Sequence, residues 1–504
     1  MTTDPVVPTR YSSQPRGGHT PPETKVSGRQ YAGLAAVVLI SELTAASYLL
    51  VATALPGIAT KYETTQTSWI LTIPALAAVV TLCFLGKLAD MRGKRLILLA
   101  AIALSTVGAI LCAVAPTFTV LLVGRVLMGL LNGVPALAYS LVRDVFPKKI
   151  VAFATAITFA GVGLGFGLAP LLSGWLVDSF GVSSVFWFMA LYQMVCAIAL
   201  LATVPESPLR LRSRLDWPAA LLIGLGGVAV LYSLSQGSTW GWTSLSFIGL
   251  FVAGLACFAA WIWWDKRFSD PLMDLTLLRS KPMWTTVVTS FFVFAVFAAL
   301  PAIVPTMLQT PSAIGGDIGF GLDASNVAYF LGPMGAGLII GGLTIGAGAR
   351  RWGIRTPMII AFVLLVVSTV GLAFRHSSLS EIVVWLVIYG LGMGAAYGGY
   401  PNLVLQAAPP ESQGISATFV TVVGNLGTGL VTQVTFVVLA AHVIPESGGA
   451  FFESRGYTIA FLATAAIAVL GLLSTLILPH GRRRDVLDMR AGEEVVAADI
   501  AAQR

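Results

Sequence analysis

Long apolar runs occupy most of this chain, and they constrain its fold more than any other feature. A helix that crosses a lipid bilayer needs about 20 consecutive, mainly apolar residues. About fourteen runs in the 504-residue sequence meet this requirement. They cover residues 31–57, 67–89, 95–115, 118–142, 150–176, 184–204, 216–236, 244–264, 284–307, 325–348, 356–374, 381–408, 414–441 and 457–478. The runs predict an all-helical, multi-pass membrane protein, and their even number places both ends of the chain on the same side.

The sparse charged residues indicate how these spans are oriented. Only 11% of the residues are charged, whereas a soluble domain carries roughly 25%. The net charge of +7 does not indicate nucleic-acid binding, because the basic residues stand in short clusters between the apolar runs. If both tails are cytoplasmic, all but four of the 30 Lys and Arg residues lie on the inner side or in the tails. The exceptions are Lys61, Arg375 and Arg455 outside and Arg125 within a span. This bias predicts cytoplasmic termini in a plasma-membrane protein.

Two ionisable residues lie deep inside the predicted spans. Glu42 is the only one of the 23 acidic residues to do so, and Arg125 is the only basic one. A charge in the bilayer core is costly, so such a residue indicates a functional site. With a rise of 1.5 Å per residue, the two lie at similar depths and would pair if the first and fourth spans are neighbours. Burial and a guanidinium act in opposite directions on a carboxyl, which makes Glu42 a candidate proton carrier with Arg125 tuning it. A static ion pair between two helices is the alternative.

Other polar residues within the spans are weaker candidates for a substrate cavity. Asn132 and Tyr139 share the span of Arg125 and lie seven residues apart, so they fall on nearly the same helix face. Asn402 and Asn425 occupy later spans. Interhelical hydrogen bonds explain such residues as readily as substrate contacts.

The sequence offers no metal or cofactor site. The four cysteines lie in separate apolar runs without metal-ligand spacing, and the four histidines fall outside the spans. An intramembrane enzyme needs clustered catalytic groups at depth, which this distribution disfavours. A sensor or scaffold that transports nothing is a further alternative, which flux measurements in vesicles would reveal.

A short loop after the second span combines glycines with charges of both signs. It reads GKLADMRGKR from Gly86, and its glycines allow tight turns. Basic residues alone would satisfy the inner-side bias, but that bias does not explain acids at the ends of the second and fourth spans. We interpret these residues as a salt-bridged gate on the inner side. The gate candidates are Gly86, Asp90, Arg92, Gly93, Arg95, Arg143 and Asp144.

The fifth span combines regularly spaced small residues with a proline. Gly161, Gly165 and Ala169 recur every four residues, a spacing that lets two helix backbones approach closely. Pro170 then weakens the helix, and Gly174 follows. We interpret this span as an interface that moves, with ordinary tight packing as the alternative.

These motifs resemble those of the major facilitator superfamily, most of all its fourteen-span drug:proton antiporter branch. The family's loop motif, G-x-L-a-D-r-x-G-r-k, is matched by Gly86, Leu88, Ala89, Asp90, Gly93, Lys94 and Arg95, with Met91 in the sixth position. Its antiporter motif is matched by Gly165, Ala169, Pro170, Ser173 and Gly174, and its fourth-span Arg and Gly by Arg125 and Gly129. Two positions differ: Ser47 stands where the branch has an Asp in the first span, and Arg350 where the second copy of the loop has one.

The resemblance covers about residues 35–480 and implies a fold and a function. The fold would be the major facilitator fold, with six-helix bundles at residues 31–205 and 284–479. Two extra spans and a cytoplasmic linker would occupy residues 206–283, with cytoplasmic tails at 1–30 and 480–504. The function would be proton-coupled efflux of small amphipathic or lipophilic compounds by a monomer that alternates access to a central cavity. A narrow-range lipid or metabolite exporter and an uptake symporter are the alternatives.

Overall fold

A computed structural model describes residues 28–64, 66–145, 165, 168–207, 216–268, 275–315, 318, 320–408, 413–444 and 451–481. Nearly all of these residues are helical, and the one β-bridge among them joins Val443 to Phe452. Eleven helices are long and apolar enough to cross a membrane, and the shorter apolar helices Ser68–Leu82, Phe118–Gly133 and Leu168–Phe180 add to them. These helices follow the predicted spans in order and position. Most of the fifth predicted span, at residues 150–164, lies outside the described residues.

The helices form an N-terminal half, an inserted pair and a C-terminal half. The N-terminal half contains α1 (Gly28–Tyr62), α2 (Ser68–Arg92), α3 (Lys94–Ala113), α4 (Phe118–Met128), η1 (Gly129–Gly133), α5 (Val134–Val145), the helix Leu168–Phe180 and α7 (Ser183–Thr203). The inserted pair is α8 (Trp217–Trp240) and α9 (Leu245–Asp265). The short η2 (Leu275–Arg279) precedes the C-terminal half of α10 (Lys281–Gln309), α11 (Ser312–Gly315), α12 (Ala324–Trp352), α13 (Arg355–Phe374), α14 (Leu379–Ala407), α15 (Gln413–Ala440) and α16 (Ser454–Ile477).

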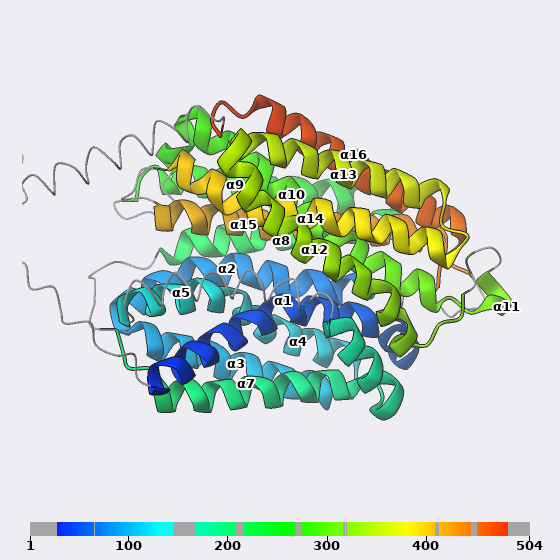
Figure 1. Cartoon of the computed structure of the whole chain (residues 1–504), viewed down its shortest axis with the longest axis horizontal. Helices are drawn as coiled ribbons and strands as arrows, with labels where there is room; N and C mark the ends of the chain where they lie inside the picture. The colour runs from blue at the N-terminus through cyan, green and yellow to red at the C-terminus, as the bar shows by residue number, and fades with distance from the viewer. Residues whose placement is uncertain are drawn as a thin grey trace, which may run out of the picture.

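The long helices run side by side along the longest axis of the molecule (Figure 1). The N-terminal half lies in the lower part of that view and the C-terminal half in the upper part, with α8 between them. Each long helix runs from one end of the bundle to the other. We call the two ends the Gly28 end and the Tyr62 end, after the first and last residues of α1.

The fourth predicted span is not one continuous α-helix. It consists of α4, a 3₁₀ turn at Gly129–Gly133 and α5. The break lies where the chain passes α2 closely, because a Cβ on Gly129 would lie only 2.9 Å from the carbonyl oxygen of Pro74. Glycine permits this approach and also lowers helix propensity, so the same residue explains the contact and the break.

The inserted pair is attached to the bundle mainly through α8. Helix α8 contacts α2 of the N-terminal half and α15 of the C-terminal half, and α9 packs on α8. The backbones of α8 and α9 meet at Gly226 and Gly254, where a Cβ on Gly254 would lie 3.0 Å from the Gly226 carbonyl oxygen. The outer face of α9 is exposed and apolar, with Leu245 88% exposed. Such a face suits contact with lipid chains.

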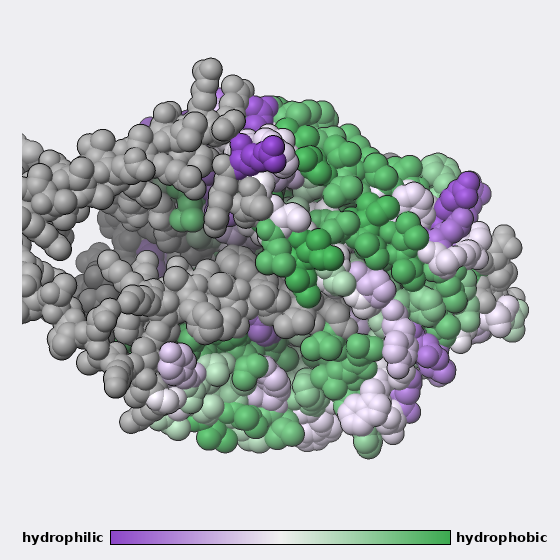
Figure 2. Space-filling model, viewed as in Figure 1, coloured by the Kyte–Doolittle hydropathy of each residue, from purple (hydrophilic) through white to green (hydrophobic). Residues whose placement is uncertain are grey.

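The surface of the bundle is apolar where a membrane would surround it. In Figure 2, hydrophobic residues cover much of the part of this face that is not grey, and hydrophilic residues gather toward its right-hand end. Exposed apolar side chains include Leu168, Ile198, Leu343 and Val384. A water-soluble monomer rarely exposes so much contiguous apolar surface. The chain is therefore an integral membrane protein whose spans are helices.

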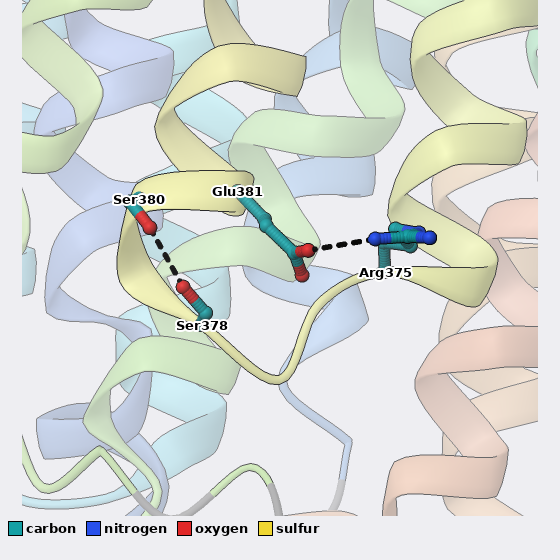
Figure 3. Close-up of polar contacts among 4 residues, drawn as sticks. All are labelled: Arg375, Ser378, Ser380 and Glu381. Carbon is teal, nitrogen blue, oxygen red and sulfur yellow. Dashed lines mark hydrogen bonds and ion pairs between the residues drawn. The ribbon is translucent and has the colours of Figure 1, made fainter.

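Charged contacts lie at the ends of the helices. At the Tyr62 end, the turn between α13 and α14 holds an ion pair of Arg375 and Glu381 at 3.2 Å, beside hydroxyls of Ser378 and Ser380 that lie 2.8 Å apart (Figure 3). The Arg375 side chain is 70% exposed. Water screens such a pair, so it contributes little to stability.

At the Gly28 end, Glu206 caps the first turn of α3. Its carboxylate accepts hydrogen bonds from the backbone N–H groups of Arg95 at 2.8 Å and Leu96 at 3.1 Å. The residue before α3 is Gly93, which has φ +120 and no side chain to cap the helix. A Cβ there would lie 2.8 Å from a Glu206 oxygen. Glu206 therefore replaces the missing local cap and ties the end of α7 to α3.

We expect Glu206→Ala to lower the free energy of unfolding by about 0.5–2 kcal/mol, the usual effect of losing a helix cap. Glu381→Ala is the matched control, because it removes an acid from an exposed ion pair and should change stability by less than about 1 kcal/mol. Thermal unfolding of both variants in one detergent compares them. Equal losses in the two variants would contradict the capping role.

Candidate functional site

The carboxyl of Glu42 is buried without a partner. Both carboxyl oxygens have almost no contact with solvent, and neither has a hydrogen-bond partner within the described part of the chain. A buried polar group normally has such a partner. One face of α1 is exposed on the Gly28 side of Glu42, at Ala35 and Leu39, whereas residues 49–56 on the Tyr62 side are all buried. Glu42 as a residue is partly exposed, although its carboxyl oxygens are buried.

Arg125 does not form an ion pair with Glu42 in this structure. Its side chain is buried, and its Nε donates a 2.8 Å hydrogen bond to the carbonyl oxygen of Ile70 on α2. Pro74, four residues later in α2, has no N–H for that carbonyl. The direct pair considered from the sequence is absent among the described contacts, because Arg125 instead satisfies the carbonyl that a proline leaves open.

We expect Arg125→Leu to destabilise the protein by about 1–3 kcal/mol, since the Ile70 carbonyl would lose its side-chain donor inside the bundle. Pro74→Ala supplies a helical N–H to the same carbonyl. In the double variant, Arg125→Leu should therefore cost less than it does alone, which a double-mutant cycle of thermal unfolding measures. Strictly additive effects would contradict this account.

Tyr48 connects the two halves near the level of Arg125. Its hydroxyl donates to the carbonyl oxygen of Ala298 on α10 at 2.7 Å and lies 3.4 Å from the hydroxyl of Thr432 on α15. The Tyr48 phenol and the Arg125 guanidinium interact electrostatically. Tyr389 on α14 donates similarly to the carbonyl of Val296, at 2.6 Å. These two tyrosines hydrogen-bond to the same stretch of α10.

Four aromatic rings from α10 and α14 form a cluster in the C-terminal half. The rings of Phe297 and Tyr397 are stacked with centroids 5.1 Å apart, and Phe294 meets Tyr400 edge to face at 5.2 Å. Tyr397 and Tyr400 also meet each other, at 5.4 Å. The carboxyl of Glu42 interacts electrostatically with the phenol of Tyr397. Glu42 of the N-terminal half therefore lies near an aromatic cluster of the C-terminal half.

The two halves are in close contact at the Tyr62 end. The carboxylate of Asp178 accepts a 2.8 Å hydrogen bond from the backbone N–H of Ser325, in the first turn of α12. Gln309 on α10 donates to the carbonyl oxygen of Thr53 on α1 at 3.1 Å. Among the described residues, each recorded hydrogen bond between the halves lies at Tyr48 or closer to the Tyr62 end. This structure is therefore closed at the Tyr62 end.

The glycine-rich motif of the fifth span contacts α1 of the N-terminal half and α12 of the C-terminal half. A Cβ on Gly165 would lie 3.8 Å from Ala46 of α1, and the hydroxyl of Ser173 donates to the carbonyl oxygen of Leu50 at 2.6 Å. On another face, a Cβ on Gly174 would lie 2.5 Å from the Cα of Ser325 on α12. Ala169 and Pro170 are buried between these contacts. The predicted Gly161 lies outside the described residues.

The predicted gate at the Gly28 end is described only in part. Arg92 is exposed, and no described residue lies within 4 Å of a Cβ placed on Gly86. Arg95 donates from its guanidinium to the carbonyl of Leu201 at the end of α7. The side chains of Asp90, Arg143 and Asp144 lie outside the described residues. The structure thus links Gly93 and Arg95 to Glu206 and α7, and the salt-bridged gate stays a prediction.

The predicted cavity residues bond within the protein. The amide nitrogen of Asn132 donates to the carbonyl oxygens of Gly129 and Pro74, at 3.2 and 3.4 Å. Those of Asn402 and Asn425 return to their own helices. The side chain of Tyr139 lies outside the described residues. The amide nitrogens of the three asparagines bond within the protein in this state, and their place in a substrate cavity stays a prediction.

Sequence reasoning missed the aromatic cluster, Tyr48 and Glu206. The tyrosines at 397 and 400 stand one helical turn apart, which is a weak signal for a shared face. No sequence pattern pointed to Phe294 or Glu206, because their contact partners lie far away in the sequence. Within the described residues, no group of three or more His, Cys, Asp or Glu side chains could hold a metal ion.

The family model described as Major Facilitator Superfamily matches residues 37–432. The chain is 28% identical over 399 residues to the multidrug resistance protein Stp of Mycobacterium tuberculosis, covering 78% of this chain and 73% of that protein. It is 25% identical to the tetracenomycin C resistance and export protein of Streptomyces glaucescens, over 86% of this chain and 80% of that one. It is also 25% identical to a uridine/deoxyuridine transporter of Lactococcus lactis, over 82% and 86%.

The fold is also that of solved transporters. The crystal structure of a bacterial homologue of the human lysosomal transporter Spinster, in an inward-facing and unoccupied conformation, aligns with a TM-score of 0.64 and 15% identity. The alignment covers 91% of this chain and 99% of that one. At this identity the likeness concerns the arrangement of the helices.

Proposed function

The chain belongs to the major facilitator superfamily, and from that premise we propose that it is a proton-coupled antiporter that exports small amphipathic or lipophilic compounds. It is a membrane transporter and not an enzyme. The observation that carries the proposal is the buried carboxyl of Glu42, which has no hydrogen-bond partner among the described residues. A carboxyl with no fixed partner exchanges its proton according to which side of the membrane it faces.

The proposed cycle uses the contacts between the halves. With the Tyr62 end closed, a substrate reaches the site from the Gly28 end as Glu42 gives up its proton there. Separation of Asp178 from Ser325, and of Gln309 from Thr53, would then open the Tyr62 end. The substrate leaves on that side and Glu42 takes up a proton, which permits the return. Asp90, Arg92 and Asp144 are the proposed latch for the other end.

The basic residues support an orientation with the Gly28 end in the cytoplasm. Lys87, Arg92, Lys94 and Arg95 cluster at that end, between α2 and α3, and membrane proteins retain such clusters on the cytoplasmic side. This orientation makes transport toward the Tyr62 end an export across the plasma membrane. The names of the Mycobacterium and Streptomyces relatives, which concern resistance and export, support the same direction.

Proton-driven transport in vesicles tests the proposal. Purified protein is reconstituted, a pH gradient is imposed and the membrane potential is clamped. An antiporter accumulates tetracenomycin C in the acidic compartment, because the compound moves against the protons. The second candidate, a nucleoside symporter suggested by the Lactococcus relative, would instead carry uridine out of the acidic compartment. Flux of either compound that ignores the pH gradient would refute proton coupling.

A further inference from the structure

We propose that a polar cavity at the Tyr62 end binds one edge of an uncharged sugar ring and that the bound sugar holds this end closed. The cavity lies between the start of α2 and the last turns of α8 and α15, and these three helices contact one another. We call it the Gln433 cavity, after the residue of α15 on its wall. Glu42 is not among its lining residues, so this inference goes beyond the proposed function.

The size of the Gln433 cavity excludes a large ligand. Its volume is about 90 Å³, whereas drug-sized ligands occupy pockets of about 300–1,000 Å³. The amphipathic compounds of the proposed transport cycle are therefore too large for it. The space suits a few hydroxyl groups on one edge of a small ring, while the rest of the ring stays in water.

The lining of the cavity is polar and carries no charge in the part of the chain that the structure describes. The lining amides belong to Gln66, Gln236 and Gln433, and Ser68 and Thr239 supply hydroxyls. An ion buried here would lack a counter-charge, which is costly. Amides and hydroxyls both donate and accept hydrogen bonds, as the hydroxyls of a sugar do. The cavity therefore favours an uncharged ligand with several hydroxyl groups.

Two buried side chains on the wall have hydrogen-bonding groups without a partner in the described part of the chain. Gln433 is 2% exposed, and its amide oxygen accepts a 3.5 Å hydrogen bond from the hydroxyl of Thr72. Its amide nitrogen has no partner among the described residues. The hydroxyl of Ser68, which is 3% exposed, has none there either. Because buried polar groups normally have partners, these two are available to a ligand.

Two aromatic rings give the cavity an apolar wall. Trp69 of α2 is 7% exposed and Phe436 of α15 is 4% exposed, so packing holds both rings in place. Trp69 also lies against Tyr232 of α8, with ring centroids 5.8 Å apart. A sugar ring carries C–H groups on its faces and hydroxyls around its edge. Aromatic surface beside amides and hydroxyls matches both kinds of group at once.

Ligand binding in this cavity is coupled to the contact between the halves. Ser68 and Trp69 lie on α2 of the N-terminal half, whereas Gln433 and Phe436 lie on α15 of the C-terminal half. The hydrogen bond from Thr72 to Gln433 already joins the two halves at this wall. A sugar that bonds to both walls binds the closed arrangement more tightly than an open one and shifts the population toward it. A sugar on the Tyr62 side should therefore slow transport.

Binding of free hexoses tests the ligand class. Saturation-transfer difference NMR is run with the purified, full-length protein in a polyoxyethylene detergent, which contains no sugar. The probes are D-glucose, D-mannose and D-galactose, each with its uronate as the charged counterpart. We expect at least one hexose to bind with a Kd of about 1 mM, as suits a ligand this small, and its uronate to bind at least about tenfold more weakly. Absence of hexose binding, or equal binding of the uronate, would overturn the proposal.

A second arm separates the two sources of such a sugar. Nanodiscs that contain a glycolipid with the bound hexose as its headgroup are compared with nanodiscs of phosphatidylcholine. Loss of the free-hexose signal only in the glycolipid nanodiscs assigns the site to a lipid headgroup. Equal signals in both assign it to a free sugar.

Variants of the wall test the place of binding. Ser68→Ala removes a hydroxyl that has no partner among the described residues, so hexose affinity should fall about two- to twelvefold, the effect of one lost hydrogen bond. Gln433→Leu should weaken binding at least as much. Ser233→Ala is the matched control, because its hydroxyl donates to the Val230 carbonyl of α8 and does not line the cavity. Thermal unfolding confirms that each variant is folded. Wild-type affinity in both Ser68→Ala and Gln433→Leu would overturn the site.

Cross-linking tests the effect on closure. Asp178→Cys and Ser325→Cys, with the four native cysteines replaced, place two thiols at a contact between the halves. The bound hexose should speed disulfide formation at least about twofold, and the acceleration should be smaller with Ser68→Ala at the same hexose concentration. An unchanged rate would overturn the role in closure. None of these measurements uses a pH gradient, so a failure of proton coupling and a failure of hexose binding are seen separately.

Discussion

Glu42→Gln abolishes transport driven by a pH gradient and leaves the protein folded: this is the largest effect we expect from a single substitution. Glutamine has nearly the shape of glutamate but carries no exchangeable proton. Within the described part of the chain the carboxyl makes no hydrogen bond, so the change removes none there. Removing a partnerless buried charge should leave the free energy of unfolding unchanged or raise it. Substrate accumulation in the acidic compartment should fall to that of protein-free vesicles.

The control for this experiment is another acid near the same helix. Glu63 follows α1 directly and is exposed, so Glu63→Gln should transport like the wild type. A second measurement follows the proton itself: a pH-sensitive dye in weakly buffered detergent reports proton release when substrate binds. This release should persist in Glu63→Gln and disappear in Glu42→Gln. Undiminished pH-driven accumulation in Glu42→Gln would show that another group carries the proton.

The second large effect is expected from Gly174→Ala, which should prevent closure at the Tyr62 end. The new Cβ would lie 2.5 Å from the Cα of Ser325, and backbone atoms cannot move aside as a flexible side chain can. Overpacking of this kind costs about 1–3 kcal/mol. The contact joins the two halves, so the cost falls on the closed state and shifts the open-to-closed ratio about five- to 150-fold. Turnover should fall while the protein stays folded.

Cross-linking across the same contact measures the shift. Asp178→Cys and Ser325→Cys, in a protein whose four native cysteines are replaced, place two thiols where a carboxylate now meets a backbone N–H. Disulfide formation should be slower with Gly174→Ala. Gly165→Ala is the matched control, because among the described residues its Cβ would meet only Ala46, at an ordinary 3.8 Å. Equal cross-linking in the two variants would contradict the closure model.

The sequence predicted the helices well because their signal is local. Apolar length alone located the spans, and glycine spacing located the motif that contacts α1 and α12. The break at Gly129–Gly133 was not predicted, because it depends on the close approach of Pro74 from another helix. The cap of α3 by Glu206 was missed for the same reason, since the residues it joins are 111 positions apart.

In the candidate site too, local features were predicted from the sequence and long-range contacts were not. The sequence identified Glu42 and Arg125 as unusual, because a charged residue inside an apolar run can be seen without knowing the fold. Their partners were not visible: Arg125 contacts the Ile70 carbonyl, and Glu42 lies near Tyr397 of the other half. Opposite charges at equal depth favour pairing, but they do not reveal that a proline leaves a carbonyl without a donor. A hydrogen bond to that carbonyl accounts for the side-chain position of Arg125.

The position of α8 gives the two halves unequal freedom on the two sides of the bundle. On one side, Gly227 of α8 faces Leu76 of α2 and Leu426 of α15 at once. Rotation of one half must therefore slide α8 along one of these helices, and each slide disturbs packed side chains. On the other side, the helix Leu168–Phe180 meets α12 with no helix inserted among the described residues. We therefore expect the halves to open as a hinge about α8 rather than by symmetric rocking, with the wider gap on the α12 side.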